Sequence, residues 1–296
     1  MDTILSTKGL TKHYGRIKAV DGLDLEIKRG SVFGILGPNG SGKTTTLGMI
    51  LDVINKTSGS YTWFGEQPTK EHRKNIGAIL ETPIFYPYLS GAKNLELVCD
   101  IKNVAYPRID EVIQQVGLKG REQDKFRTSS LGMKQRLSIA SALLCDPEVM
   151  ILDEPTNGLD PQGIAAIREL IIEIAKSGKT IVLASHLLDE VQKVCTDFSV
   201  LKQGKLIYTG KVEDVTKGEI AVEVMADKPL GDLLEQAPFI ASVKEEKGKF
   251  VVILEEGHNA TDINKLLIDK GIVASHLFTV HQSLEKQFLE VLKESK

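Results

Sequence analysis

The chain has 296 residues, of which 26% are charged, with a net charge of -3 and three cysteines. Its length favours one large domain and a smaller one, because domains commonly contain about 100–200 residues. The weakly acidic balance and the lack of a clustered basic stretch argue against nucleic acid as a partner, and Cys99, Cys145 and Cys195 lie too far apart to indicate a disulfide framework or a CxxC metal site.

The first part of the chain, up to about Tyr208, alternates apolar strand candidates with amphipathic helix candidates. This pattern is typical of an α/β fold in which helices cover both faces of a sheet. Two early segments instead alternate apolar and polar residues with period two, which predicts an antiparallel β subdomain beside the main sheet. The predicted antiparallel strands are Ile4–Thr11 and Leu23–Ile27, and the predicted strands of the main sheet are Ser31–Leu36, Val149–Asp153 and Thr180–Ser185.

A glycine-rich loop follows the strand Ser31–Leu36 and precedes the helix-like segment Thr46–Leu51. The spacing GxxxxGKT in this context predicts a P-loop, in which backbone N–H groups surround the phosphates of a nucleotide. Lys43 would reach the β- and γ-phosphates, and Thr44 would offer its hydroxyl to Mg²⁺, while the helix N-terminus favours the anion. The predicted nucleotide-binding residues of this loop are Gly37, Pro38, Asn39, Gly40, Ser41, Gly42, Lys43, Thr44 and Thr45.

Two adjacent carboxylates, Asp153 and Glu154, end the apolar strand Val149–Asp153. Because ligands bind at the carboxyl ends of the strands in open α/β sheets, we expect both carboxylates beside the P-loop. Asp153 would hold Mg²⁺ directly or through water, and Glu154 would polarise the water that attacks the γ-phosphate. The next segment, Pro161–Ser177, has an apolar stripe at helical spacing and is predicted to be a helix packed on the core.

The segment Thr128–Arg136 places small residues immediately before the helix-like segment Leu137–Leu144. Together with the P-loop, the triplet Asp153-Glu154-Pro155, the GLDP run at 158–161 and the pair Ser185-His186, this segment resembles the signature of an ATP-binding-cassette (ABC) ATPase. The family pattern LSGGQxQR lies over residues 129–136. It matches at Ser130, Gly132, Gln135 and Arg136 and departs at Ser129, Leu131 and Met133.

The resemblance implies that two cassettes meet head to tail, so that the signature segment of one subunit caps the P-loop nucleotide of the other. Ser130 would donate a hydrogen bond to the γ-phosphate, Gly132 would allow close backbone approach, and Asp160 is also expected at the nucleotide. His186 matches the switch histidine that contacts the γ-phosphate, and Tyr14 matches the aromatic residue that stacks on adenine. The implied nucleotide is ATP, with Mg²⁺ as its cofactor.

One position departs from the family pattern. Most of these ATPases have a glutamine after the strand that leads toward the helical subdomain, whereas this chain has Glu81 in the run ILETP. A carboxylate is able to ligate Mg²⁺, so Glu81 is a candidate metal ligand beside Thr44 and Asp153, although it would add negative charge next to the phosphates.

The expected fold is therefore a P-loop ABC cassette over residues 1–214, with a mixed central sheet, the antiparallel β subdomain and a helical subdomain at about 85–145. Beyond Val215, shorter units in the order βαββαβ, with a final helix, predict a small α+β domain over residues 215–296 of a ferredoxin-like kind. These units are Glu219–Met225, Pro229–Gln236, Ile240–Glu245, Lys249–Leu254, Ala260–Asp269, Ile272–Val280 and Ser283–Leu292.

The run Gly77–Tyr86, together with Ser130–Arg136, resembles bacterial cassettes that serve bacitracin-resistance and lantibiotic-immunity exporters. This resemblance implies an ATPase that energises the export of an antimicrobial peptide or another amphiphile. No apolar run approaches the roughly 18 residues that span a bilayer, and the amino terminus is unlike a signal peptide. We therefore expect a peripheral protein at the cytoplasmic face of the membrane, paired with an identical or different cassette and with a separate transmembrane permease, which residues 81–89 would contact.

Two other classes of function stay open at this point. An uptake system could use such a cassette, with the module at 215–296 binding a small regulator, and binding of an amino acid or ion to that module alone would favour this alternative. A soluble cassette protein that remodels nucleic acid or ribosomes usually joins two cassettes or carries a long coiled coil, whereas this chain has one P-loop and no such insertion. A non-catalytic scaffold is disfavoured because Asp153 and Glu154 are both present.

Overall fold

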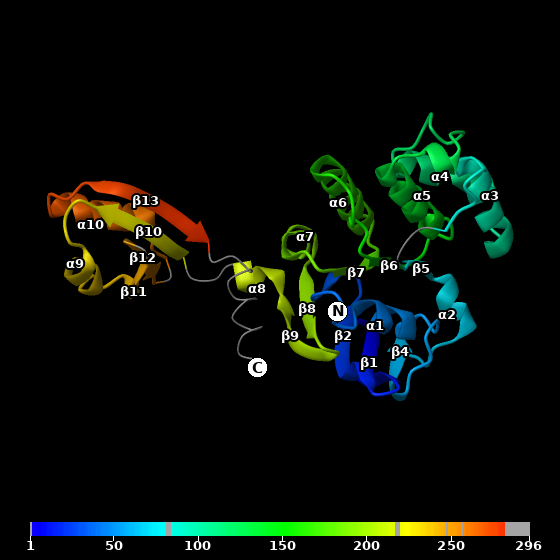
Figure 1. The fold of residues 1–296 in the computed structure, drawn as a ribbon, viewed down its shortest axis with the longest axis horizontal. Coiled ribbons are helices and arrows are strands. Elements are labelled where there is room, and N and C mark those ends of the chain that lie inside the picture. Colours follow the sequence, from blue (N-terminus) through cyan, green and yellow to red (C-terminus); the bar gives the residue numbers. More distant parts are fainter. Residues whose placement is uncertain (1, 81–83, 217–219, 247, 256, 282–296) are drawn as a thin grey trace. The chain divides into compact units, whose positions relative to one another are not determined.

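The computed structural model describes residues 2–80, 84–216, 220–246, 248–255 and 257–281 (Figure 1). The chain divides into two compact units, Met1–Gly210 and Lys211–Lys296. The first unit contains a central sheet of six strands in the order β5-β6-β7-β3-β8-β9. These strands are β5 (Ile76–Ile79), β6 (Val149–Asp153), β7 (Thr180–Ser185), β3 (Val32–Leu36), β8 (Asp197–Lys202) and β9 (Lys205–Lys211).

The strands from β5 to β8 in this order are parallel to their neighbours, and every residue of β3, β6 and β7 is buried. Continuous apolar strands of this kind occur where helices cover both faces of a parallel sheet. Parallel neighbours also end at the same edge, because Leu36 pairs with Ser185 and Asp153 pairs with Ala184. The loops after β6, β7 and β3 therefore leave the sheet side by side.

An antiparallel sheet with the order β2-β1-β4 packs on the same core as the central sheet. Its strands are β1 (Thr3–Tyr14), β2 (Ile17–Lys28) and β4 (Ser58–Trp63), so the two predicted strands are real and longer than their apolar alternation indicates. Helix α1 (Lys43–Ile50) shares this core through Leu47 and Met49, which are buried together with residues of both sheets. The helix that follows the glycine-rich loop is therefore held in place by packing with residues of both sheets.

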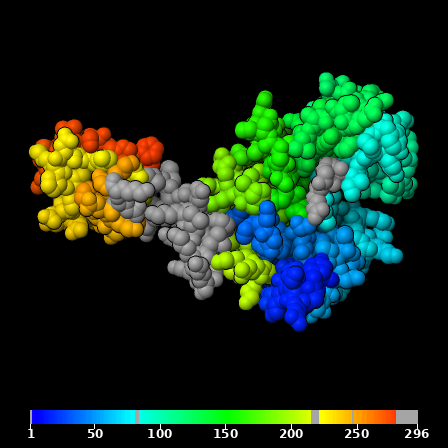
Figure 2. All heavy atoms as spheres, viewed as in Figure 1, coloured from blue at the N-terminus to red at the C-terminus, as the bar shows by residue number. Residues whose placement is uncertain are grey.

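The helical part of the first unit contains α3 (Gly91–Lys102), α4 (Pro107–Gln115) and α5 (Leu131–Leu143), which contact one another, and a short 3-10 turn at Phe126–Thr128. Figure 2 shows the atoms of this part, cyan to green, at the surface of the first unit. The predicted start of the last helix at Leu137 is wrong. Ser130 caps α5, since its hydroxyl accepts a hydrogen bond from the Met133 N–H, and the helix therefore begins at Leu131.

Three further helices belong to the first unit: α2 (Lys70–Lys74), α6 (Pro161–Lys176) and α7 (Leu188–Val194). Helix α6 coincides with the predicted amphipathic helix to within one residue, and its apolar stripe, Ile167, Leu170, Ile171 and Ile174, is buried. Its N-cap is Asp160, whose carboxylate accepts a 2.7 Å hydrogen bond from the Gly163 N–H. Helix α7 contacts β3 and β7 and directly follows the end of β7.

The second unit has its own core and its own four-stranded antiparallel sheet in the order β11-β12-β10-β13. After α8 (Val212–Thr216), its elements are β10 (Ile220–Ala226), α9 (Gly231–Glu235), β11 (Ile240–Glu246), β12 (Lys249–Leu254), α10 (Ala260–Asp269) and β13 (Ala274–His281). Both the chain order βαββαβ and the spatial order, in which the first strand lies between the third and the fourth, are those of a ferredoxin-like module. The predicted final helix, Ser283–Leu292, lies outside the described residues.

Candidate functional site

The loop between β3 and α1 has a shape that only glycine permits at several positions. Gly40 and Gly42 have φ angles of +78° and +105°, which L side chains rarely adopt. A Cβ on Gly42 would lie 2.5 Å from the Ala19 carbonyl oxygen, and one on Gly37 would press on the Leu201 carbonyl oxygen and on Ser41. The backbone can therefore wrap closely at the N-terminus of α1, as a phosphate-binding loop requires.

Lys43, the first residue of α1, is a buried cation at the mouth of this loop. Its side chain is only 6% exposed, and its Nζ donates to the Gly37 carbonyl oxygen at 2.8 Å. The same Nζ lies 3.2 Å from Oε1 of Glu154, the first residue after β6. The structure thus brings together Lys43 and Glu154, which belong to separate motifs in the sequence.

The side chains of Thr44 and Asp153 meet beside the glycine-rich loop. The Thr44 hydroxyl donates a 2.7 Å hydrogen bond to Oδ2 of Asp153, which is buried at the end of β6. Hydroxyl and carboxylate oxygens are ligands that Mg²⁺ accepts, and this ion commonly uses few protein ligands together with water and substrate phosphates. No group of three or more His, Cys, Asp or Glu side chains that could hold a metal occurs within the described ranges.

Glu154 and His186 lie at the ends of the adjacent strands β6 and β7 and contact each other. The Nδ1 atom of His186 is 2.7 Å from Oε2 of Glu154, and the His186 N–H also donates to that oxygen at 3.4 Å. The Glu154 N–H donates to the Ala184 carbonyl oxygen at 2.9 Å, which fixes the two loops side by side. Glu154 is therefore held between a cation and an imidazole.

A pocket of about 470 Å³ opens beside these residues. Asn39, Gly40, Gly42, Lys43, Thr44, Thr45 and Glu154 line it, together with Ile17, Lys18 and Ala19 of β2 and Gln203 of the turn between β8 and β9. The residues of β2 and Gln203 belong to none of the motifs recognised in the sequence. The turn is brought to the loop by long-range backbone contacts, such as the 3.0 Å bond from the Gly204 N–H to the Ser41 carbonyl oxygen, so no local signal could have found it.

Tyr14 lies at the end of β1, outside the residues that line this pocket. Its side chain is 48% exposed, and its strand partner Ile17 does line the pocket. Lys12 holds its Nζ 4.8 Å from the centre of the Tyr14 ring. The ring is therefore largely exposed and has a cation over one face, and its strand partner is one of the residues that line the pocket.

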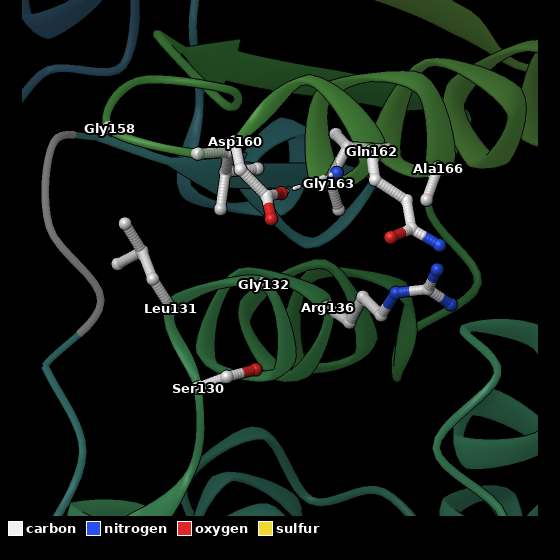
Figure 3. Close-up of a pocket in the computed structure, with 11 residues that line it drawn as sticks. Ser130, Leu131, Gly132, Arg136, Gly158, Asp160, Gln162, Gly163 and Ala166 are labelled. Carbon is white, nitrogen blue, oxygen red and sulfur yellow. Dashed lines mark hydrogen bonds between the residues drawn. The ribbon is translucent and has the colours of Figure 1, made fainter.

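The signature residues lie in a different place. A second pocket, of about 460 Å³, lies between the N-terminal ends of α5 and α6 and is lined by Ser130, Gly132 and Asp160 (Figure 3). In Figure 3 the side chains of Arg136 from α5 and Gln162 from α6 point toward each other across it. None of the residues that line this pocket lines the pocket at Lys43. The structure thus separates the predicted nucleotide-binding residues into two groups within one chain.

Glu81, the remaining candidate metal ligand, lies outside the described residues. The exposed segment after it is described from Ile84, which is 96% exposed, and includes Tyr86 and Tyr88 at 53% and 62% exposure. Within the described residues, no helix combines the length and the apolar character that crossing a membrane requires.

Several known proteins are similar to this chain over most of its length. The family described as ABC transporter matches residues 20–157. An uncharacterized ABC transporter ATP-binding protein, YhcH of Bacillus subtilis, is 38% identical over 100% of this chain and 98% of its own length. The bacitracin transport ATP-binding protein BcrA of Bacillus licheniformis is 37% identical over 99% and 98%, and the lantibiotic transport ATP-binding protein SrtF of Streptococcus pyogenes is 37% identical over 69% and 89%.

Two solved structures show the same cassette fold. The cbiO1 protein of Clostridium perfringens, part of the ABC transporter complex cbiONQ, has a TM-score of 0.65 and 30% identity, covering 73% of this chain and 91% of its own. The cassette MJ0796, solved as a dimer in a post-hydrolysis state with ADP and Pi, has a TM-score of 0.64 and 26% identity, covering 71% and 99%. Relatives of this similarity over nearly the whole chain show that it belongs to the ABC transporter ATP-binding proteins, the family of ATPases whose general activity is ATP hydrolysis coupled to transport.

Proposed function

We propose that this chain hydrolyses ATP to power a membrane exporter of an antimicrobial peptide or a similar amphiphile. The observation that carries the ATPase part is the convergence of Lys43, Thr44, Asp153, Glu154 and His186 at the ends of three neighbouring strands. The cargo class is supported by the similarity to BcrA, which extends over both units of this chain rather than over the cassette alone.

In this function the phosphates of ATP bind at the glycine-rich loop. The Lys43 ammonium, now held by loop carbonyls and by Glu154, turns to the β- and γ-phosphates, which offer it stronger charge-assisted hydrogen bonds. Thr44 and Asp153, whose side-chain oxygens already lie 2.7 Å apart, would hold Mg²⁺. When bound, the ion neutralises charge that develops on the transferred phosphoryl group.

Glu154 is the proposed general base. Once Lys43 turns to the phosphates, Oε1 of Glu154 loses that partner and is able to accept a proton from the attacking water. Oε2 stays in contact with Nδ1 of His186, which orients the carboxylate. The imidazole of His186, whose side chain is 34% exposed, would contact the γ-phosphate in this proposal.

A second cassette completes the site in this proposal. Ser130, Gly132 and Asp160 line a pocket of their own, and its lining residues include none of those at Lys43. The N-terminus of α5 borders that pocket, and its partial positive charge suits an anion supplied by another subunit. Head-to-tail pairing would place the Ser130 pocket of each subunit over the nucleotide of the other.

The permease contact is proposed at the exposed aromatic segment around Tyr86 and Tyr88. Their rings lie 5.8 Å apart and are more than half exposed. The buried Asn94 accepts from the Tyr86 N–H at 2.8 Å and donates to the Tyr86 carbonyl oxygen at 3.1 Å, so the segment is presented on a fixed backbone. Exposed apolar clusters often mark interfaces, and this one would hold the chain at the cytoplasmic face of the membrane.

The test uses the native host with its copy of the gene removed. Restoring the wild-type chain is expected to raise the tolerated concentration of bacitracin or of a lantibiotic, whereas the Glu154→Gln chain is expected to restore nothing. Affinity purification from gently solubilised membranes should recover a membrane protein in about equal amount with both chains. Equal sensitivity of all strains to both peptides would contradict the cargo, and recovery of ribosomal or soluble partners only would contradict the transport function.

A further inference from the structure

A buried carboxylate outside the nucleotide pocket joins the two loops that carry Glu154 and His186. Glu190, on α7, is 3% exposed. Its Oε2 accepts a 2.8 Å hydrogen bond from the Ser185 hydroxyl, and its Oε1 accepts one from the Thr156 hydroxyl. Both partners are neutral hydroxyls, and no ion pair of Glu190 occurs in the part of the chain that the structure describes. A carboxylate kept in the core needs such donors.

The Ser185 hydroxyl bridges the two residues on either side of His186. Ser185 precedes this histidine, and the Ser185 oxygen accepts a 3.0 Å hydrogen bond from the N–H of Leu187, which follows it. A serine hydroxyl has one proton, so donation to Glu190 leaves its lone pairs free for Leu187. The carboxylate of Glu190 therefore sets the direction of the hydroxyl that holds the His186 turn.

The second hydroxyl controls the loop that carries Glu154. Thr156 is buried two residues after Glu154, whose backbone has a φ of 48°. A glutamate adopts this left-handed conformation only when its surroundings hold it there. The bond from Thr156 to Glu190 is one of these restraints, and it attaches the loop after β6 to the helix after β7.

We propose that Glu190 is a positioning residue for ATP hydrolysis, which fastens the loops after β6 and β7 so that Glu154 and His186 meet at 2.7 Å. This role rests on the proposed function of Glu154 as general base. Glu190 is absent from the residues that line the nucleotide pocket, so it acts through the two loops and not on ATP itself. Loss of its carboxylate should therefore slow turnover without weakening nucleotide binding.

The test measures kcat, KM and nucleotide affinity in the full chain carrying Glu190→Ala or Glu190→Gln. The kcat of Glu190→Ala is expected to fall by about tenfold or more, with the Kd of a fluorescent ATP analogue changed by less than about threefold. Glu190→Gln keeps the side-chain shape and is expected to lose less. Asp189→Ala is the matched control, since Asp189 is the adjacent carboxylate on α7 but is exposed and pairs with Arg168 and Lys193. A wild-type kcat in both Glu190 variants would overturn the proposal.

A double-mutant cycle separates positioning from general support of the fold. If Glu190 acts by holding Glu154 against His186, Glu190→Ala should slow a chain that already carries His186→Ala by a smaller factor than it slows the wild type, whereas effects that multiply in full would overturn the proposal. Thr156→Val removes one hydroxyl and Thr156→Ser retains it, so slow turnover of the valine variant with rescue by serine supports the same conclusion even if Glu190→Ala does not fold. Wild-type turnover of Glu154→Gln would contradict the proposed function instead, whatever the Glu190 variants show.

Discussion

Glu154 has a left-handed backbone conformation, and its carboxylate contacts Lys43 and His186. The left-handed conformation of such a residue costs on the order of 1–2 kcal/mol. Two backbone hydrogen bonds offset that cost. The Glu154 N–H donates to the Ala184 carbonyl oxygen, and the Glu154 carbonyl oxygen accepts from the Asn157 N–H. The side chain thereby reaches Lys43 with one oxygen and His186 with the other. At this scale the geometry suits the proposed role of Glu154 as general base, because the carboxylate has one partner on each oxygen.

Replacing Glu154 by glutamine should stop hydrolysis while ATP still binds. The amide keeps the shape and the contact to His186 but does not accept the proton of water, so kcat should fall by about 10²-fold or more. With Mg²⁺ and ATP the variant should accumulate as a dimer, measured by size-exclusion chromatography. Glu173→Gln, an exposed change on α6, is the control. Turnover at the wild-type rate would mean that another group activates the water.

Replacing Lys43 by alanine should remove most of the affinity for ATP. Two charge-assisted hydrogen bonds to phosphate, at about 1.5–3 kcal/mol each, correspond to a loss of about a hundredfold or more in Kd. The removal also leaves Oε1 of Glu154 without its cation in the nucleotide-free state. Titration with a fluorescent ATP analogue measures the loss, and Lys176→Ala, at an exposed position on α6, should bind as wild type. Micromolar binding retained by Lys43→Ala would contradict the role of this lysine.

Among the elements, those with a strong local signal could be predicted and those set by distant contacts could not. Strands β6 and β7 coincide with their predicted bounds because each is an apolar run with polar residues at both ends. The start of α5 was misplaced because small residues there resemble a loop, although Ser130 is in fact its cap. Gln203 reaches the nucleotide pocket only through packing of the β8–β9 turn on the glycine-rich loop, which no local pattern reveals.

Asp146 links elements that are distant in sequence, and its contribution to stability should depend on pH. The hydrogen bond from the Lys179 ammonium, before β7, holds the pKa of the Asp146 carboxyl below its usual value, and Arg108 of α4 adds to this. A lowered pKa means stabilisation that is present above the ordinary value of about 3.9 and is lost as the pH falls through the lower folded-state value.

Asp146→Asn keeps the left-handed backbone tolerable at this position, where φ is 48°, and removes only the charge. Because the side chain is 70% exposed, the expected loss at pH 7 is only about 0.5 kcal/mol. Denaturant unfolding at pH 7 and at pH 3 measures it. The difference between variant and wild type should be smaller at pH 3 than at pH 7 and should shrink in high salt, and a difference that grows as the pH falls would contradict this assignment.

At the scale of the whole molecule, the candidate site residues fall into two pockets. Residues of the glycine-rich loop and Glu154 line the pocket at Lys43, whereas Ser130 and Gly132, at the N-terminal end of α5, line the other. The lining residues of the two pockets do not overlap. A reaction that needs both sets therefore needs two chains, and activity should depend on how the chains are combined.

Mixing two inactive variants tests this arrangement directly. Lys43→Ala retains the Ser130 pocket, and Ser130→Arg retains the nucleotide loop but fills the second pocket with a long side chain. Each variant alone should be nearly inactive. In an equal mixture, half of the dimers pair the two variants and each such dimer has one intact composite site, so activity should recover to at most about one quarter of the wild-type rate. Ser130→Asn keeps the helix cap and serves as the control for loss of folding. Full activity of Ser130→Arg alone would show that each chain works by itself. No recovery in a mixture that forms heterodimers would show that one composite site is not enough for turnover.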